Sequence, residues 1–289
     1  MMSRVRQSAN RIHAGQFLIT IDRPLLVGIL NVTPDSFSDG GQFRSDDEAI
    51  AHALRMVEAG AAMLDIGAES SRPGAIPVTE EEETARLMPM LEKIARHCRV
   101  PISVDTTKAG VARRAIEAGA SLINDISALR FDPAMGKLAA ETGAGLVLMH
   151  MPGTPQTMQQ QASYADVVHE VTAYLTERMA AAEAIGVKSE QIVLDPGFGF
   201  GKLVPHNLAL LDRLPELCDL GRPLFVGLSR KSFIGQVTGR PVNEREFGTA
   251  AAVALAVERG ASLLRVHDVA HMADAVKVVE AVMRQRAQK

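Results

Sequence analysis

The sequence predicts a single (β/α)8 barrel, a fold in which eight parallel strands alternate with eight helices. Two observations support this fold class. Short continuous apolar runs recur eight times, as expected of parallel strands that are covered on both faces. Helical patterns separate the runs, and neither a Pro/Gly/Ser-rich linker nor a run of like charges interrupts the alternation. The 289 residues therefore indicate one domain, since such barrels typically need about 250 residues.

One phrase repeats where a helix is expected to lead into a strand. It reads EAGAAMLDIG at 58–67, EAGASLINDI at 117–126, ETGAGLVLMH at 141–150 and ERGASLLRVH at 258–267. Each copy has a helix end, a Gly suited to the left-handed position after a helix, an apolar run and then a polar residue. The repeat predicts helix–strand units.

The apolar runs give the expected strands. They are 25–30, 63–66, 102–104, 121–123, 145–149, 191–194, 224–228 and 262–266. Residues 1–23 are expected to add an amino-terminal strand or hairpin, and residues 24–285 to form the barrel. The alternative is an open doubly wound sheet, but that fold usually carries G-x-G-x-x-G after its first strand, whereas Asn-Val-Thr-Pro follows Leu30 here.

The intervening helices have recognisable ends. Capping boxes at 45–48 and 79–82 open two of them. Pro89 is expected to kink or divide the second, because proline lacks the N–H that the helix ladder needs. An apolar stripe from Val167 to Met179 predicts a long helix packed on the core, which Gly186 ends.

Composition excludes several classes of protein. Hydrophobic residues make up 47% of the chain and charged residues 22%, with a net charge of −3, so there is a full core but no basic surface for nucleic acid. The amino terminus lacks an apolar signal core, and the longest apolar run, 250–257, is too short to span a bilayer. Cys98 and Cys218 form neither a metal motif nor a disulfide framework. We expect a cytoplasmic protein without a nucleic-acid or membrane partner.

Polar residues stand at or just after the end of nearly every expected strand. They are Asn31, Asp65, Asp105, Asn124, His150, Asp195, Ser229 to Lys231, Arg265 and His267. Any one of them could be a helix cap or a satisfied buried group. In a parallel barrel, however, the carboxyl ends of all strands meet at one mouth, where active sites lie. So many polar residues at one mouth predict a binding site.

These residues favour a small ligand with two different ends. Carboxylates and amides suit the edge of a flat heterocycle, and cations suit an anionic tail. The first group is Asp105, Asn124 and Asp195, and the second is Arg72, Arg265 and His267. Asp65 is expected either to touch the ligand or to orient a neighbour. His150 and His271 lack metal-ligand spacing and are expected to be structural.

Two loops that follow strands are long for this fold. Such connections usually have about two to six residues, but those at 31–45 and 67–78 are longer and rich in Gly, Pro, Ser and charge. They are candidate lids that exclude water, although plain surface insertions would have a similar composition. A polar loop at 151–161 is expected to flank the site.

The stretch LDPGFGFGK at 194–202 resembles a phosphate-binding P-loop but lacks its spacing. A P-loop reads G-x-x-x-x-G-K-[ST], whereas Gly197 and Gly201 are too close together and Leu203 follows Lys202. The stretch is therefore expected to turn the chain at the barrel mouth. Lys202 would be either a supporting charge near the site or a solvated one.

Seven motifs occur in one order: NVTPDSFSDGG, DIGAESSRPGA, SVDT, INDIS, LDPGFGFGK, GLSRKSFIG and RVHDV. In order and spacing they closely resemble the dihydropteroate synthase family, the folate-pathway enzymes that sulfonamides block. The resemblance covers essentially residues 24–285. It implies a pterin-binding barrel that converts 6-hydroxymethyl-7,8-dihydropterin diphosphate and 4-aminobenzoate to 7,8-dihydropteroate and diphosphate, with Mg²⁺ as cofactor.

The resemblance also implies roles for individual residues. The pterin would be held by Asp105, Asn124, Asp195 and Lys231. The diphosphate would be held by Ser71, Arg72, Arg265 and His267. The aminobenzoate would contact Phe37, Pro73 and Ser232, and the metal would contact Asn31. The catalytic residues would be Asp105, Asp195 and Lys231, with the carboxylates supporting the cation that remains when diphosphate departs.

The second loop differs from the family's common D-x-G-G-E-S-T-R-P-G pattern at two positions. Ser71 replaces a Thr and keeps its hydroxyl, so a phosphate contact is expected to survive. Ala68 replaces a Gly, which leaves the stiffness of the loop open.

Three other functions fit part of the pattern. A methyltetrahydrofolate-dependent methyltransferase would share the pterin pocket but would not need Arg72 or Arg265. An aldolase would form a Schiff base on Lys231, and a non-catalytic protein would only bind pterin. Apolar stretches at 249–257 and 276–283, together with the dimers usual in the family, predict a homodimer.

Overall fold

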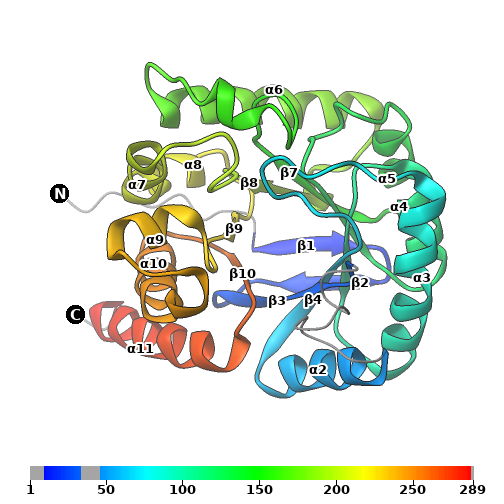
Figure 1. Ribbon diagram of the computed structural model, residues 1–289, viewed down its shortest axis with the longest axis horizontal. Coiled ribbons are helices and arrows are strands. Elements are labelled where there is room, and N and C mark those ends of the chain that lie inside the picture. Colours follow the sequence, from blue (N-terminus) through cyan, green and yellow to red (C-terminus); the bar gives the residue numbers. More distant parts are fainter. Residues whose placement is uncertain (1–9, 34–45, 288–289) are drawn as a thin grey trace.

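Eight parallel strands form a nearly closed barrel in the computed structural model, which describes residues 10–33 and 46–287 (Figure 1). The strands are β3 (Leu25–Asn31), β4 (Ala61–Gly67), β5 (Ile102–Asp105), β6 (Leu122–Asp125), β7 (Gly145–Met149), β8 (Ile192–Asp195), β9 (Phe225–Gly227) and β10 (Leu263–Val266). Their order is β8-β7-β6-β5-β4-β3-β10-β9, and an isolated parallel bridge between Leu194 and Leu224 joins the two edges. The (β/α)8 prediction is confirmed.

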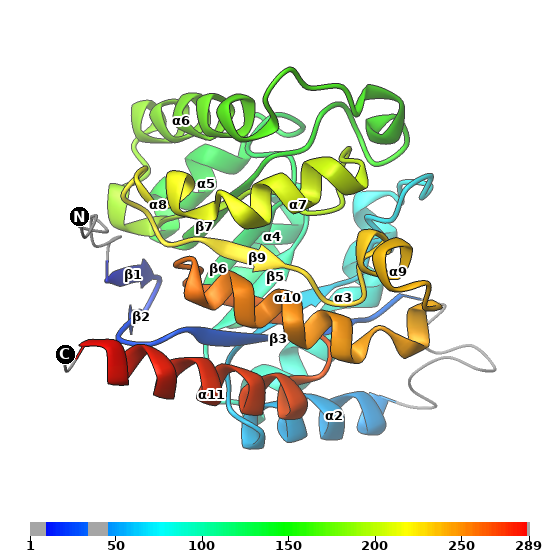
Figure 2. The ribbon, with the colours of Figure 1, turned by 90° about the vertical axis from the view of Figure 1, so that its left-hand side faces the viewer.

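Helices surround the strands on the outside (Figures 1 and 2). They are α2 (Asp46–Glu58), α3 (Glu80–His97), α4 (Ala109–Glu117), α5 (Met135–Thr142), α6 (Val167–Ile185), α7 (Val204–Asp212), α8 (Leu214–Cys218), α9 (Ser232–Thr238), α10 (Glu246–Glu258) and α11 (Val269–Ala287). The 3-10 helices η1 (Met158–Gln161), η2 (Ser189–Gln191) and η3 (Val242–Glu244) lie in connections. In the described part of the chain, no helix is both long and apolar enough to cross a membrane.

Helix α3 contradicts one of the two outcomes predicted for Pro89, because Pro89 does not divide it. The helix begins where the sequence indicates, with the Thr79 side chain accepting a hydrogen bond from Glu82 N at 3.2 Å. It then continues through Pro89 to His97. Pro89 and Ala85, whose carbonyl loses its helical donor, are both exposed, so water can replace the missing hydrogen bond.

The interior of the barrel changes from apolar to polar along the strands. Alternate residues of a strand face the same side, and the inward-facing ones begin as a buried apolar layer that includes Met63, Leu122 and Val193. Two residues further along the same strands stand Asp65, Asn124 and Asp195. The strands therefore extend beyond their apolar runs, and their polar ends line the mouth.

A hairpin, β1 (Arg11–Ala14) and β2 (Phe17–Thr20), covers the opposite, amino-terminal end of the barrel (Figure 2). Its side chains Ile12, Ala14 and Ile19 join the inner apolar layer. Its turn is fixed by a hydrogen bond from Gly15 N to Gly143 O at 2.8 Å. The hairpin thus packs on the end of the barrel that lies away from the polar mouth.

Candidate active site

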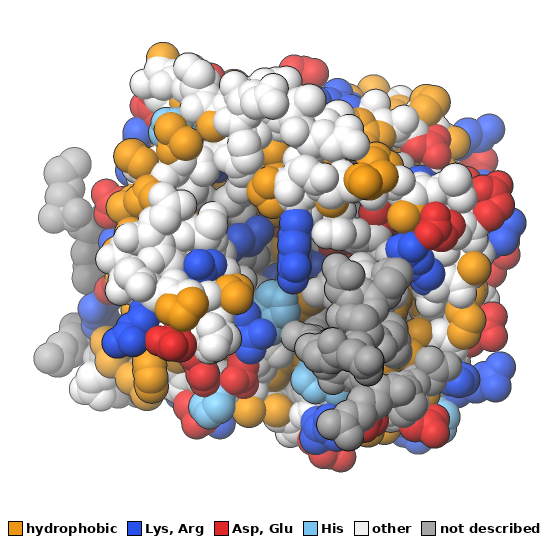
Figure 3. All heavy atoms as spheres, in the orientation of Figure 1, with side chains coloured by type: hydrophobic (Ala, Val, Ile, Leu, Met, Phe, Trp, Pro, Cys, Tyr) orange, Lys and Arg blue, Asp and Glu red, His pale blue; other side chains and the backbone are white. Residues whose placement is uncertain are grey.

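The mouth of the barrel is a hollow with Lys, Arg and His side chains gathered around it (Figure 3). At its base, Arg265 on β10 joins two carboxylates. Its Nε donates to Asp65 Oδ2 at 2.5 Å, and one terminal nitrogen donates to Asp105 Oδ2 at 2.8 Å. Asn124 Nδ2 also donates to Asp65 Oδ2, at 3.2 Å. Asp65 therefore orients Arg265 and Asn124 from below, which was one of its two predicted roles.

This cluster retains unused acceptors and one carboxyl group, Asp105, with a shifted pKa. Asp65 Oδ1 and Asn124 Oδ1 are buried without a hydrogen-bond partner. Burial raises the pKa of Asp105 to about 7, although the charge of Arg265 acts in the opposite direction. A ligand that donates N–H groups here would stabilise the ionised carboxyl. The base of the mouth is therefore suited to a donor-rich ligand edge.

Asp195 and Lys231 stand on the other side of the mouth. Burial raises the pKa of Asp195 to about 6, although its Oδ1 accepts a hydrogen bond from Gly197 N at 2.7 Å. Burial lowers the pKa of Lys231 to about 8, against the attraction of Asp195. The Lys231 ammonium lies 4.2 Å from the centre of the Phe200 ring. An acid, a base and an aromatic face thus border one part of the mouth.

Lys202, whose role the sequence left open, is buried rather than solvated. Its ammonium lies 2.9 Å from His150 Nδ1 and donates to the carbonyls of Gly197 at 2.9 Å and Phe200 at 3.0 Å. It also donates to His150 O at 3.3 Å. Burial lowers the pKa of Lys202 to about 7 and that of His150 to about 2, so His150 is neutral and accepts. The Gly-rich stretch folds around its own lysine.

The backbone of this stretch requires its glycines. Gly197 has φ of +70°, and a Cβ there would lie 2.0 Å from the carbonyl oxygen of His150. Gly199 has φ of +81° and lies against the aliphatic part of Lys231, whose Cδ would be 3.0 Å from an added Cβ. Both positions combine a left-handed conformation with close contact, which only glycine accommodates easily.

His267 lies among cations but is itself neutral. Burial first, and then the charges of Arg265 and Arg230, lower its pKa to about 3. Its Nδ1 is 2.9 Å from Ser229 Oγ. Arg72 is close enough to add to the same effect. The predicted anion-binding residues Arg72, Arg265 and His267 therefore act on one region of the mouth, with His267 as a hydrogen-bonding group until an anion raises its pKa.

The other predicted contacts are placed less directly. Ser71 lines a cavity of about 250 Å³ together with Asp105, whereas Pro73 and Ser232 are exposed on the β4–α3 loop and at the first turn of α9. Asn31 is half-buried at the end of β3. Within residues 10–33 and 46–287, no hydrogen bond joins Asn31 or Ser232 to the Asp65–Arg265 cluster. Phe37 lies outside the described residues.

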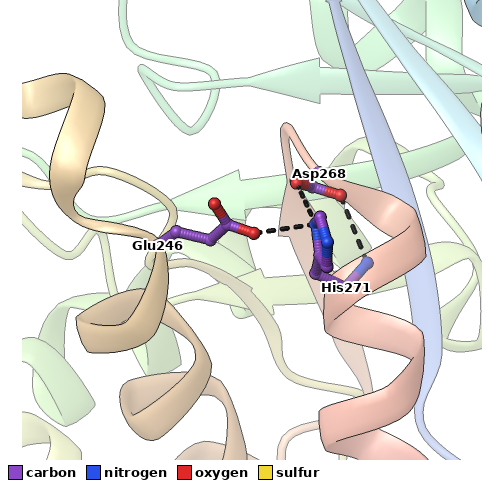
Figure 4. A group of neighbouring side chains, drawn as sticks. All are labelled: Glu246, Asp268 and His271. Atoms are coloured by element: carbon purple, nitrogen blue, oxygen red, sulfur yellow. Dashed lines mark hydrogen bonds and ion pairs between the residues drawn. The ribbon is translucent and has the colours of Figure 1, made fainter.

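Two groups of charged side chains were missed by sequence reasoning. Lys108, after β5, lies between the carboxylates of Glu69 and Glu83. On the outer surface, His271 Nδ1 lies 2.7 Å from Glu246 Oε1 and 2.6 Å from Asp268 Oδ2, so it links α10 to α11 (Figure 4). The only available indication for Lys108 was its place three residues beyond a strand-end Asp.

A (β/α)8 barrel with buried carboxylates and basic side chains at its mouth has the architecture of an enzyme for a small ligand that is part heterocycle and part anion. Known proteins support this class. Residues 27–267 match the family described as pterin binding enzyme. Dihydropteroate synthase of Escherichia coli (strain K12) is 47% identical over 271 residues, which cover 94% of this chain and 96% of that protein.

Solved structures agree. Dihydropteroate synthase of Xanthomonas albilineans with 4-aminobenzoic acid is 48% identical, with a TM-score of 0.89 over 96% of this chain and 99% of that one. The structure from the same organism with 7,8-dihydropteroate is 46% identical, with a TM-score of 0.85 over 94% of this chain and 98% of that one. The chain belongs to the pterin-binding enzyme family and, within it, to the dihydropteroate synthases, which are transferases.

Proposed function

We propose that the protein condenses 6-hydroxymethyl-7,8-dihydropterin diphosphate with 4-aminobenzoate to give 7,8-dihydropteroate and diphosphate. The observation that carries the proposal is the buried cluster of Asp65, Asp105, Asn124 and Arg265 opposite Asp195 and Lys231. It combines acceptors for a pterin edge with cations for an anionic group. The relatives' complexes with 4-aminobenzoic acid and 7,8-dihydropteroate support the two ends of the reaction.

In this proposal the pterin lies between the two carboxyl groups. Asp105, Asn124 and Asp195 accept or donate along its polar edge. The Lys231 ammonium, which lies over the Phe200 ring, donates a hydrogen bond to the pterin. Loss of diphosphate would leave a cationic methylene conjugated to the dihydropterin ring, and ionised Asp105 and Asp195 would lower its energy. The arylamine of 4-aminobenzoate then attacks the methylene, so no side chain need become a nucleophile.

The diphosphate would be held by Ser71, Arg72, Arg265 and His267. Arg265 is shared with Asp65 and Asp105, so its orientation is set before the anion binds. His267 donates while neutral and would gain charge as negative charge develops on the leaving group. Pro73, Ser232 and Phe37 are the proposed aminobenzoate contacts.

Magnesium is the proposed cofactor, and Asn31 would hold it. The Asn31 amide oxygen is a hard ligand at the end of β3, and Asn31 pairs in the sheet with Gly67, where the second loop begins. Mg²⁺ commonly takes few protein ligands and completes its shell with phosphate oxygens and water. The residues present therefore fit the ion, which would supply positive charge to the departing diphosphate.

Diphosphate release tests the proposal directly. Purified protein is incubated with the pterin diphosphate and 4-aminobenzoate, with and without Mg²⁺, and release is measured. Mg²⁺-dependent release that requires both substrates and is inhibited by a sulfonamide is expected, and release no faster than without enzyme would refute the function. Because burial raises the pKa of Asp105 to about 7 and of Asp195 to about 6, kcat/KM should fall as pH drops through that range.

Asp105→Asn provides a matched test of the mechanism. The amide keeps the shape and removes the negative charge, so kcat should fall by at least about 10²-fold while pterin binding changes much less. Equal turnover in the variant would contradict the role given to Asp105.

We also propose a cytoplasmic homodimer. Apolar side chains on the outer helices support the dimer, since Leu255, Val278 and Val282 are 41%, 65% and 48% exposed on α10 and α11. Light scattering that gives only a 31.0 kDa species at micromolar concentration would contradict it. Introducing a charge, as in Val278→Glu, should shift a dimer towards monomer.

A further inference from the structure

The β4–α3 loop is closed at its base by one carboxylate. Glu69 stands where the loop begins, and its Oε1 accepts a hydrogen bond from Val78 N, nine residues further on, at 3.3 Å. The segment between them carries Ser71 and Arg72. At its far side, Gly74 N donates to Pro155 O at 3.1 Å, so the loop after β7 supports it as well.

The same carboxylate is tied to the barrel through Lys108. The Lys108 ammonium contacts Glu69 Oε2 and also donates to Glu83 Oε2 at 2.7 Å. These residues come from three different segments: Glu69 from the β4–α3 loop, Lys108 from the end of the β5–α4 loop, and Glu83 from α3. We call Glu69, Lys108 and Glu83 the clip.

The clip is largely removed from water, so its charges interact strongly. The side chains of Lys108 and Glu69 are 23% and 21% exposed, and that of Glu83 is fully buried. Glu83 Oε1 has no hydrogen-bond partner, and burial raises the pKa of Glu83. Loss of Lys108 would remove the cation that holds Glu69 to Glu83, and the buried Glu83 would take up a proton, so Glu69 would lose its tie to the barrel.

The clip also borders the substrate region. Glu69, Lys108, Ser71 and Asp105 line the same cavity of about 250 Å³ under the loop. Lys108 is three residues beyond Asp105 in the chain. A shift of the clip would therefore move Ser71 and Arg72 relative to Asp105.

We propose that the clip positions the β4–α3 loop so that Ser71 and Arg72 meet the diphosphate, with Lys108 as a positioning residue that does not itself touch substrate. The inference rests on the proposed function. It predicts that the clip discriminates between a pterin with a diphosphate and the same pterin without one, because only the former uses the loop.

The test compares the binding of two ligands, 6-hydroxymethylpterin and its diphosphate, by calorimetry. In Lys108→Met, the affinity for the diphosphate should fall by about tenfold or more, while that for the alcohol stays within about twofold. Hydrogen exchange of residues 69–78 should accelerate. Lys137→Met is the matched control, since Lys137 is 76% exposed and pairs only with Glu141 among the described ion pairs. It should change neither affinity.

Glu69→Gln keeps the result decisive if Lys108→Met folds poorly, and a double variant tests the shared role of the loop if Lys108→Met folds well. Glu69→Gln removes one charge and leaves the Lys108–Glu83 pair, and it should reduce the same affinity ratio by a smaller factor. In the double variant with Arg72→Ala, loss of Lys108 should add little, because both changes act through one loop. A well-folded variant with an unchanged ratio would overturn the clip, whereas wild-type protein that binds neither ligand would refute the proposed function instead.

Discussion

Two loops at the mouth are each organised by a lysine that is buried or part-buried, but in opposite ways. In the β8–α7 loop, Lys202 comes from the loop itself and is surrounded by carbonyl oxygens and the His150 ring. In the β4–α3 loop, Lys108 comes from a neighbouring loop and contacts two carboxylates. Burial lowers the pKa of Lys202, whereas the carboxylates, acting against burial, raise that of Lys108.

The difference shows how one barrel fixes two loops at its mouth by different kinds of lysine contact. A lysine that satisfies its own loop's carbonyls fixes a shape that changes only if the loop unfolds. A lysine shared between segments joins parts that can separate when the charges change. In the proposed function, the β8–α7 loop borders the pterin, which keeps its shape, and the β4–α3 loop meets the diphosphate, which departs.

Replacing Lys202 should reduce the stability of the protein more than any change in the β4–α3 loop. Lys202→Met keeps the length of the side chain but removes the donor for several buried acceptors. We expect a loss of about 4 kcal/mol in the free energy of unfolding, since each unsatisfied buried acceptor costs roughly 1–3 kcal/mol. Urea unfolding followed by circular dichroism measures it, with Lys137→Met as control. A loss of less than about 1 kcal/mol would show that the fold of the β8–α7 loop does not depend on Lys202.

Two glycine substitutions compare the backbones of the loops. Gly197 and Gly74 both have a positive φ, +70° and +80°, but an added Cβ would meet the His150 carbonyl at 2.0 Å in the first case and open space in the second. Gly74→Ala should cost about 1 kcal/mol for the left-handed backbone alone. Gly197→Ala should cost about 3 kcal/mol or more because overpacking is added. Equal melting temperatures of the two variants would contradict the proposed difference.

Alkaline pH should affect the two lysines with opposite sign. Between the folded pKa of Lys202, about 7, and its unfolded value of 10.5, the unfolded chain binds more protons, so stability rises with pH. The slope is at most about 1.4 kcal/mol per pH unit. For Lys108, whose pKa is raised, the stabilisation is complete below 10.5 and is lost only as pH rises through the folded value.

Urea unfolding between about pH 7.5 and 9.5 separates the two contributions. The wild-type slope should be smaller in Lys202→Met, where Lys231, with a folded pKa of about 8, still contributes, and it should be retained in Lys108→Met. An undiminished slope in Lys202→Met would assign it to other groups.

The smallest effect on stability is expected from removing the surface ion pairs of His271, which join α10 to α11. Contact with Asp268, and then the charge of Glu246, raises the pKa of His271. Its contribution is therefore present below 6.5 and is lost as pH rises through the folded value. His271→Ala should lower the melting temperature slightly at about pH 6 and not at about pH 9. A larger shift than that of Lys108→Met would mean that exposed ion pairs matter here more than part-buried ones.

The sequence predicted most of the fold because its regularities are local. Apolar runs and helix caps depend on neighbouring residues, so the strands were found in order, and the polar strand ends indicated the mouth. The clip could not be found in this way. Lys108 contacts Glu69 and Glu83 at separations of 39 and 25 residues, and Glu83 stands in a run of glutamates typical of an exposed helix start. Lys202 stayed ambiguous because only tertiary contacts show that it is buried.

The isolated bridge between Leu194 and Leu224 makes the junction of β8 and β9 the seam of the barrel. Asp195 ends one side of this seam, and Lys231 follows the strand on the other. The two residues therefore belong to neighbouring strands that are joined by only an isolated backbone bridge. A pterin that contacts both residues would link the two strands and stabilise their junction. Ligand binding should therefore slow amide exchange along β8 and β9, including at residues that the ligand does not touch.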